Sequence, residues 1–515
     1  MRIGIDVGGT NTDAVLMDGT RVVTWHKTAT TPDVSSGIVS ALAEVLASGS
    51  CPPGDVGAVM IGTTHFTNAV VERKRLLEVA AVRIALPATQ ALPPMVDWPP
   101  DLRDAIGNHR FWLHGGYEFN GREITRMRED EVRDLARQVR DQGIQSIALT
   151  SAFAPVNGGM EQRAAEIFRE EIPDAHVTLS SEIGRIGLLE RENATIMNAC
   201  LVQLARGVVS SFRVALDRLS ISAPFFISQN DGTLMTAEFA EQYPVLTFAS
   251  GPTNSMRGAA FLSGVRDAVV VDVGGTTSDV GVLRHGFPRE ASTEVEIARV
   301  RTNFRMPDIV SFGLGGGSIV RQNGDAIVIG PDSVGYELTT RGLVFGGDTL
   351  TATDIAVAAG RADVGDRSLV AHLDGALVER ALHEIDSAVE LAVDRIKTSA
   401  DAVPVVLVGG GTILLGESLA GASELVKPDH ASVANAIGAA IAQVGGEIDH
   451  VFSLDGTNRE EVVASARRDA IAKAVEAGAQ PDTVEIVEVD EIPLTYLPSN
   501  ATRMRVKAVG DLVLS

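Results

Sequence analysis

The sequence predicts an α/β protein built from two related halves. Two observations predict this: apolar runs alternate with amphipathic stretches along most of the chain, and one five-residue phrase occurs twice. Asp6-Val-Gly-Gly-Thr10 and Asp272-Val-Gly-Gly-Thr276 each follow an apolar run. Alternating strand and helix patterns are typical of helices packed on a sheet. The repeat indicates that each half contributes an equivalent part to one site.

Each copy of the phrase is predicted to form the turn of a β-hairpin. The segments IGIDVGGTNTDAVL (3–16) and VVVDVGGTTSDVGVL (269–283) place an acidic residue and two glycines between two strands. Glycines turn the chain tightly and free backbone N–H groups for an anion. Asp6 and Asp272 would repel phosphate unless a divalent cation lay between, so the pair is interpreted as a clamp for a magnesium nucleotide. The alternative is that both glycine-rich hairpins have only a structural role and bind no nucleotide.

The residues predicted to cradle the phosphates come from both turns. They are Gly8, Gly9, Thr10, Asn11, Thr12, Gly274, Gly275, Thr276 and Thr277, with a further hydroxyl at Ser278.

Length, charge and cysteine content narrow the class of protein. A chain of 515 residues exceeds one ordinary core, so two to four domains are expected. The net charge of -23 argues against binding to nucleic acid or to an anionic membrane surface. Two cysteines, Cys51 and Cys200, cannot build a disulfide framework, which fits a reducing cytoplasm. We expect neither a leader sequence nor an apolar run of the about 18 residues that span a membrane.

Residues 1–175 are predicted to form a first unit. Its C-terminal boundary is placed where the alternation of strand and helix patterns ends, at Pro173-Asp174. The expected elements after the first hairpin are a helix at 34–46, a strand at 57–61, a helix at 68–74, an irregular excursion at 87–126, a helix at 128–142, a strand at 144–150 and a helix at 159–171.

Residues 176–445 are predicted to form the second unit, which carries the second hairpin. A long helix within 180–219 holds Glu190, Arg191, Glu192, Asn193 and Asn198, expected to form a solvated or salt-bridged face. A hinge helix lining a cleft is the alternative. The segment 249–252 precedes a helix whose N-terminus can meet an anion.

Two further glycine clusters follow in this second unit. Residues 313–318 form a glycine-dense turn, expected to face the same cleft. The strand 405–408 ends in Gly409, Gly410, Gly411 and Thr412, which lets the backbone approach a flat ligand. A small-residue helix is expected at 435–443, and residues 446–515 are predicted to form a small C-terminal α/β domain with a helix at 459–476 and a strand at 484–489.

This order of hairpins, helices and glycine-rich strand ends resembles the actin, hexokinase and Hsp70 superfamily of ATPases. Within it, the chain resembles the hydantoinase A and 5-oxoprolinase family. The resemblance rests on both hairpins and on IGTTHFTNAVVERK (61–74), LSSEIGRIGLLERENATIMNA (179–199), ISQNDGTLMTAEFA (227–240), ASGPTNSMRGAA (249–260) and GLGGGSI (313–319).

The resemblance implies two actin/hexokinase-like ATPase domains that close on ATP, with an additional N-terminal α/β region and a small C-terminal appendage. It implies ATP-dependent opening of a cyclic amide such as a hydantoin or 5-oxoproline, together with a second subunit and an oligomeric assembly. Asp6 and Asp272 would hold Mg²⁺, Gly409 to Thr412 would lie along adenosine, and Asp279 would add a polar contact.

Two departures from the family pattern concern the substrate side. Members of the family usually have Asp-Ile-His before the glycine run, whereas this chain has Val310 in place of the histidine. The stretch of prolines and cysteine expected after Gly330-Pro-Asp-Ser333 is replaced by residues 335–342. The resemblance therefore leaves open whether a second metal is bound and whether the substrate is the usual lactam or an unusual one.

His65 is a candidate general base, because it follows a strand end beside Thr63 and Thr64. A structural histidine bonded to its neighbours is the alternative. Two other functions remain open: a small-molecule kinase of the sugar-kinase type, and a non-catalytic ATPase that reactivates or activates a partner enzyme. Iron–sulfur activators are set aside, because two distant cysteines cannot hold a cluster.

Overall fold

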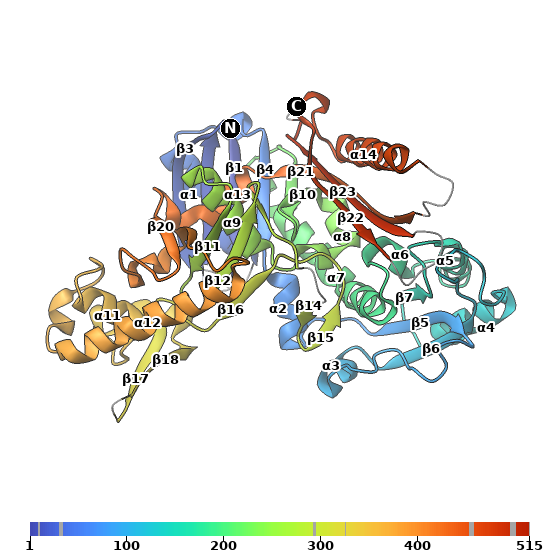
Figure 1. Ribbon diagram of the computed structural model, residues 1–515, viewed down its shortest axis with the longest axis horizontal. Coiled ribbons are helices and arrows are strands. Elements are labelled where there is room, and N and C mark those ends of the chain that lie inside the picture. Colours follow the sequence, from blue (N-terminus) through green and yellow to red (C-terminus); the bar gives the residue numbers. More distant parts are fainter. Residues whose placement is uncertain are drawn as a thin grey trace.

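The computed structural model confirms the α/β class. It describes residues 1–8, 11–29, 34–291, 295–324, 326–452, 458–494 and 501–513. These residues form a nine-stranded sheet, a six-stranded sheet, a four-stranded sheet and two small hairpins (Figure 1).

The nine-stranded sheet runs in the order β22-β23-β21-β10-β9-β4-β1-β2-β3. Its strands are β1 (Arg2–Val7), β2 (Asn11–Asp18), β3 (Arg21–Ala29), β4 (Ala58–Thr63), β9 (Phe225–Ser228), β10 (Thr233–Thr236), β21 (Gln443–Phe452), β22 (Glu485–Pro493) and β23 (Thr502–Gly510).

The six-stranded sheet runs β13-β12-β11-β19-β20, with β16 also paired to β12. Its strands are β11 (Ala268–Val273), β12 (Ser278–Arg284), β13 (Phe287–Pro288), β16 (Ile309–Phe312), β19 (Val403–Val408) and β20 (Ala422–Val426).

The same five-strand topology occurs in both large sheets. In the first, β2 and β3 are antiparallel neighbours of β1 and β2, while β4 and β9 run parallel to β1. In the second, β12, β13, β19 and β20 repeat this arrangement around β11. The predicted duplication therefore extends from the repeated phrase to the topology of both halves.

Two helices pack together between the halves. Helix α9 (Ser250–Ser263) precedes the second sheet, and α13 (Ala434–Ala440) leads back to the first. A Cβ at Gly258 would lie 1.9 Å from the Ala434 carbonyl oxygen, and one at Gly438 would lie 1.8 Å from that of Asn254. Only glycine at these two positions lets the helix backbones approach so closely, which confirms the tight packing expected of the small-residue helix.

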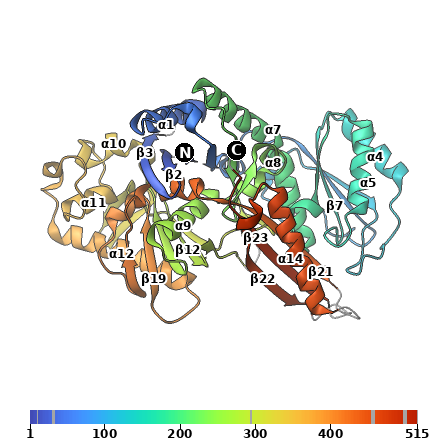
Figure 2. The ribbon, with the colours of Figure 1, turned by 90° about the horizontal axis from the view of Figure 1, so that it is seen from above.

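The four-stranded sheet is a separate parallel unit at one end of the molecule, opposite the unit of the second sheet (Figure 2). Its order is β6-β5-β7-β8, with β5 (Val79–Leu86), β6 (His109–His114), β7 (Ser146–Ser151) and β8 (His176–Leu179). Helices α4 (Glu129–Asp141) and α5 (Gly159–Glu171) pack on it, close to their predicted bounds. The expectation of an irregular excursion at 87–126 is wrong in part, because α3 (Pro100–Ala105) and β6 lie there.

The C-terminal strands extend the nine-stranded sheet. β21 pairs with β10 and with β23, so the α/β appendage expected at 446–515 shares its sheet with the first hairpin. Helix α14 (Arg459–Glu476) has its predicted bounds and packs on β21 and β23 through Ala466 and Ala470.

The remaining elements cover the sheets or connect them. The helices are α1 (Val34–Ser48), α2 (His65–Glu72), α6 (Ser180–Ile183), α7 (Leu188–Arg218), α8 (Ala237–Gln242), α10 (Leu338–Arg341), α11 (Ala352–Ala358) and α12 (Gly375–Ile396). The small hairpins are β14 (Val295–Ile297) with β15 (Val300–Thr302), and β17 (Ser318–Asn323) with β18 (Ala326–Ser333).

Helix α7 bears on two expectations. Of the solvated or salt-bridged face, the salt bridge is confirmed but lies inside the fold: Glu192 is 2 % exposed and forms an ion pair with Arg83, while the buried Asn193 accepts a hydrogen bond from Trp98. By length and composition α7 is also apolar enough to cross a membrane, contrary to the expectation of no such run, and 56 % of its most apolar window is buried inside the fold. Burial of this kind is ordinary for the core helix of a folded domain.

Candidate active site

Each hairpin closes its turn in the same way. The Gly8 N–H donates to the Asn11 carbonyl oxygen at 3.0 Å, and the Gly274 N–H donates to that of Thr277 at 2.9 Å. Gly9 and Thr10, predicted to cradle phosphate, lie outside the described residues. At the positions that the structure describes in both copies, the repeated phrase therefore forms two turns closed by the same hydrogen bond.

The acidic residues of the hairpins come in cross-strand pairs. Asp6 on β1 lies directly opposite Asp13 on β2, and Asp272 on β11 lies opposite Asp279 on β12. Sequence reasoning missed Asp13, although both copies space their aspartates seven residues apart. Because directly opposed side chains share one face of a sheet, the site contains two carboxylate pairs rather than two single aspartates.

The first pair is held from α13 and β3. The Asn435 amide donates to Asp6 Oδ2 at 3.0 Å and to Asp13 Oδ2 at 2.8 Å. Lys27 Nζ lies 2.7 Å from Asp13 Oδ1. Burial, together with the charges of Asp13 and Asp272, raises the pKa of Asp6 to about 7, while the hydrogen bond from Asn435 opposes the shift. The charge of Asp272 therefore reaches Asp6, which brings the two predicted aspartates into one electrostatic site.

The second pair is held by hydroxyl groups. Ser255 of α9 hydrogen-bonds to Asp272, and Ser311 of β16 donates to Asp279. Burial raises the pKa of Asp272, and it raises that of Asp279 to about 6 with help from the charge of Asp272. Burial thus destabilises the ionised form of both carboxylates.

A glycine at the end of the neighbouring strand makes room for the first aspartate of each pair. A Cβ at Gly62, near the end of β4, would lie 2.4 Å from Asp6 Oδ1, and a Cβ at Gly409, after β19, would lie 2.3 Å from Asp272 Oδ1. Asp6 Oδ1 and both amide atoms of Asn254 are buried without a hydrogen-bond partner among the described residues. A Cβ at Gly62 would also lie 2.5 Å from Asn254 Nδ2. The unpaired polar atoms of Asp6 and Asn254 therefore both lie next to Gly62, which has no side chain.

The glycine-dense turn 313–317 packs on the second hairpin, and its predicted position facing the cleft stays a prediction. Gly316 N–H donates to the Gly274 carbonyl oxygen at 3.0 Å, and Gly317 N–H donates to that of Gly275 at 2.7 Å. A Cβ at Gly315 would lie 2.5 Å from the Thr276 nitrogen, so this contact requires glycine.

The threonine and serine hydroxyls of the turns differ in their access to a ligand. Thr277 is exposed and Thr276 is half-buried, whereas Thr12 is buried. Ser278 Oγ donates to the Leu314 carbonyl oxygen at 2.7 Å and is fully buried, so its assignment as a phosphate donor is corrected to a structural one.

The third glycine cluster is not uniform. Gly409 has φ of 90°, and a Cβ at Gly411 would lie 2.6 Å from Val273 Cγ1, whereas Gly410 is exposed with nothing within 4 Å of the Cβ position. Thr412 is buried beneath them. The contact of this cluster with adenosine remains a prediction, and Gly410 is the position most open to a ligand.

Comparison with protein families identifies the chain. A model described as the hydantoinase/oxoprolinase N-terminal region matches residues 2–172, and a model described as hydantoinase/oxoprolinase matches residues 191–396. The chain belongs to the hydantoinase/oxoprolinase family.

Individual relatives agree with this assignment. The chain is 26 % identical over 384 residues to the caprolactamase subunit alpha of Pseudomonas jessenii, covering 70 % of this chain and 54 % of that protein. It is 27 % identical over 394 residues to the acetophenone carboxylase gamma subunit of Aromatoleum aromaticum, covering 70 % and 53 %. The chain thus spans about half the length of these two relatives.

A solved structure confirms the fold. The crystal structure of the ATP-dependent caprolactamase from Pseudomonas jessenii superposes with a TM-score of 0.79 at 20 % identity, covering 100 % of this chain and 88 % of that chain. This member of the hydantoinase/oxoprolinase family therefore shares the α/β fold of that caprolactamase structure.

The departure from the family pattern at Val310 has a structural counterpart. Val310 pairs with Val280 on β12 and packs against the core of the second sheet. Among the described residues, no group of three or more His, Cys, Asp or Glu side chains is arranged to hold a metal ion. The second departure, at 335–342, lies over the second turn, because a Cβ at Gly335 would lie 3.9 Å from Thr276 Oγ1.

His65 begins α2, directly after β4. Its Nδ1 lies 2.6 Å from Thr63 Oγ1, and burial with the charge of Arg75 lowers its pKa to about 4. The ring is therefore neutral at pH 7 and a weak base. Its hydrogen bond to Thr63 matches the structural alternative, and a catalytic role remains a prediction.

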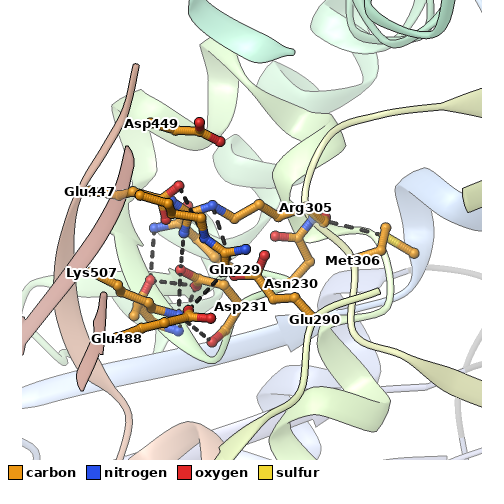
Figure 3. A network of polar contacts seen from close by, with 12 residues as sticks. Gln229, Asn230, Asp231, Glu290, Arg305, Met306, Glu447, Asp449, Glu488 and Lys507 are labelled. Carbon is orange, nitrogen blue, oxygen red and sulfur yellow. Dashed lines mark hydrogen bonds and ion pairs between the residues drawn. The ribbon is translucent and has the colours of Figure 1, made fainter. Parts of the chain in front are cut away.

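A cavity of about 570 Å³ lies between β21, the loop after β9 and the segment before α7, and no described hairpin residue lines it. Charged side chains at its base pair with one another (Figure 3). Asp231 lies 3.0 Å from both Arg305 and Lys507, and Arg305 also pairs with Glu447. Because these ion pairs join Glu447 of β21 and Lys507 of β23 to Asp231 in the loop after β9 and to Arg305, we interpret the network as structural and place the candidate active site at the hairpins.

Proposed function

We propose that this chain is the ATP-dependent subunit of an enzyme that opens a cyclic amide. The observation that carries the proposal is the pair of equivalent hairpins, whose two carboxylate pairs act on each other electrostatically. Family membership supports it, because the relatives include a caprolactamase subunit, and the matching crystal structure is of an ATP-dependent caprolactamase. An amide is a poor electrophile, and phosphorylation of its oxygen makes that oxygen a leaving group.

The chemistry balances as follows. The amide oxygen attacks the γ-phosphorus, the bond from phosphorus to the β–γ bridging oxygen breaks, and ADP leaves with the electron pair. The amide N–H proton is lost, which gives an O-phosphorylated imidate. Water then adds at carbon and the ring nitrogen departs with a proton, which leaves an acyl phosphate. A second water adds at the same carbon and phosphate departs with the original amide oxygen, so that lactam, ATP and two waters yield an amino acid, ADP and phosphate.

The residues around the hairpins would act mainly by positioning and charge neutralisation, as is general for phosphoryl transfer. Backbone N–H groups of Gly275 and Thr276, with the exposed Thr277 hydroxyl, are suited to bind phosphate oxygens. Asn435 and Ser255 fix the carboxylates from the two linking helices. Gly410 would face the adenosine.

The carboxylate set fits one Mg²⁺ ion. Asp6 Oδ1 is buried without a partner, and a cation would supply one and lower the pKa of Asp6. Two aspartates from opposite hairpins, with waters and phosphate oxygens, match the preference of Mg²⁺ for few protein ligands. When bound, the ion would neutralise charge on the phosphates. Asp6 and Asp272 are the residues we assign to hold it.

We further propose that a second subunit completes the reaction. The two relatives reported above are named as subunits, and this chain spans about half of their length.

We place the protein in the reducing cytoplasm, because Cys51 and Cys200 are both free thiols buried in the fold.

ATP turnover in the presence of cyclic amides tests the proposal. Purified chain, with and without the product of its genomic neighbour, is assayed for ADP release with hydantoins, 5-oxoproline and simple lactams. We expect at least one cyclic amide to stimulate ADP release, and Asp272→Ala to abolish that stimulation while the protein stays folded. Absence of stimulation under every pairing, or full stimulation in the variant, would contradict the proposal.

A further inference from the structure

Lys27 lies beside the first carboxylate pair. It is on β3, directly opposite Asp13 on β2, and its ammonium nitrogen is 2.7 Å from Asp13 Oδ1. The Lys27 side chain is 31 % exposed, whereas that of Asp13 is 5 % exposed. The ammonium group therefore lies at the surface of the site, above a carboxylate that is buried.

The charge of Lys27 reaches both halves of the site. It lowers the pKa of Asp6 in its own hairpin and that of Asp272 in the other. Among the described residues, it is the cation that acts on both of these aspartates. A polyanionic phosphate chain between the two hairpins would therefore lie within the field of this ammonium group.

The second hairpin has no equivalent cation at the matching position. Ser311 lies opposite Asp279, as Lys27 lies opposite Asp13, and only a hydroxyl is offered there. The duplicated architecture is thus electrostatically asymmetric. Negative charge that develops during phosphoryl transfer would be stabilised more strongly on the side of the first hairpin.

The ammonium group is oriented by a chain of contacts from α13. Asn435 donates to Asp13 Oδ2 at 2.8 Å, and Asp13 Oδ1 contacts Lys27. An ammonium group has three N–H donors, so one can remain on Asp13 while the others bind a second acceptor. The held carboxylate limits the long lysine side chain to positions over the site.

We propose that Lys27 binds the transferred phosphoryl group and that Asp13 positions its ammonium. This inference rests on the proposed function. Lys27 stays protonated throughout: the bond from phosphorus to the bridging oxygen breaks, a bond to the acceptor oxygen forms, and Lys27 stabilises the charge on the equatorial oxygens. Preorganised donors of this kind act on the transition state more than on the ground state.

Binding of a transition-state mimic tests the proposal without turnover. The dissociation constant of the full chain for MgADP is measured with and without aluminium fluoride, which mimics the phosphoryl group in transfer. We expect Lys27→Met to change the affinity for ADP alone by no more than about twofold and to weaken binding with aluminium fluoride about 100-fold. Asp13→Asn should show a smaller loss of the same kind, and Lys27→Arg should recover part of it.

Arg21→Met is the matched control. Arg21 lies on the same strand and pairs with Asp18 at the far end of the β2–β3 hairpin, where both side chains are exposed. It should leave both affinities unchanged. Melting temperatures of all variants identify any loss caused by unfolding, and Lys27→Gln replaces Lys27→Met if the latter does not fold.

The outcomes separate the inference from the proposed function. A wild-type chain that binds no ADP overturns the proposed function itself. If the wild type binds ADP but gains nothing from aluminium fluoride, or Lys27→Met keeps the full gain, the proposal for Lys27 is overturned while the proposed function stands.

Discussion

The three consecutive glycines after β19 should respond differently to the same substitution. Gly409 has φ of 90° and ψ of 160°, a region open essentially to glycine alone, and its Cβ would lie 2.3 Å from Asp272 Oδ1 and 2.4 Å from the Val273 carbonyl oxygen. Backbone strain of about 1–3 kcal/mol adds to overpacking of about 1–3 kcal/mol, so Gly409→Ala should cost about 2–6 kcal/mol of folding free energy.

Gly411→Ala should also destabilise the fold, because its Cβ would lie 2.7 Å from the Gly274 carbonyl oxygen. Gly410→Ala should change the free energy of unfolding by less than about 0.5 kcal/mol, since its Cβ would enter open space. If that space receives adenosine, the added methyl should nevertheless weaken ATP binding by about tenfold, or about 1.4 kcal/mol.

Two measurements on each variant check this reasoning. Urea unfolding gives the order of stability, and titration with a non-hydrolysable ATP analogue gives the affinity. The reasoning is refuted if Gly409→Ala is as stable as the wild type. The assignment of this cluster to adenosine is refuted if Gly410→Ala binds the analogue with wild-type affinity.

Three further predictions concern burial and charge. Glu192→Gln should cost about 3–5 kcal/mol in a melting experiment, because it leaves the Arg83 guanidinium buried without a counter-charge, and a cost below about 1 kcal/mol would contradict this. Gly62→Ala should displace Asp6 and abolish MgATP binding in a titration. The control is Gly57→Ala, just before β4, where the added Cβ makes only an ordinary van der Waals contact; this variant should bind MgATP like the wild type. Burial would raise the pKa of Asp231, but Lys507 and Arg305 outweigh it and hold the pKa well below its usual range. Because the folded pKa is depressed, the stabilisation is present above the unfolded value of about 3.9 and is lost as pH falls below it, so the melting temperature should drop below about pH 4, and less steeply in Asp231→Asn.

The sequence was sufficient for features that depend on local pattern. The two hairpins, α5 and α14 have their predicted bounds or nearly so, because strand alternation, glycine turns and helical spacing are properties of neighbouring residues. The seven-residue spacing of Asp6 and Asp13, repeated at Asp272, was also present as a signal and was not used.

Other features depend on contacts between distant segments. Lys27 becomes a candidate only through the register of β2 with β3, and Asn435 reaches Asp6 across 429 positions of chain. The polar residues of α7 are usual for a solvated face, and only the fold supplies the buried Arg83 that pairs with Glu192. Such contacts cannot be inferred from composition or periodicity.

The central claim is that ATP phosphorylates the oxygen of a cyclic amide, and oxygen labelling tests it most directly. A lactam that stimulates ADP release is prepared with ¹⁸O in its carbonyl group and incubated with ATP, the chain and its partner subunit. Because the phosphorylated oxygen departs with phosphorus, the account predicts one ¹⁸O atom in the inorganic phosphate, detected by mass spectrometry. Unlabelled phosphate, with all of the ¹⁸O retained in the amino acid carboxylate, would contradict it.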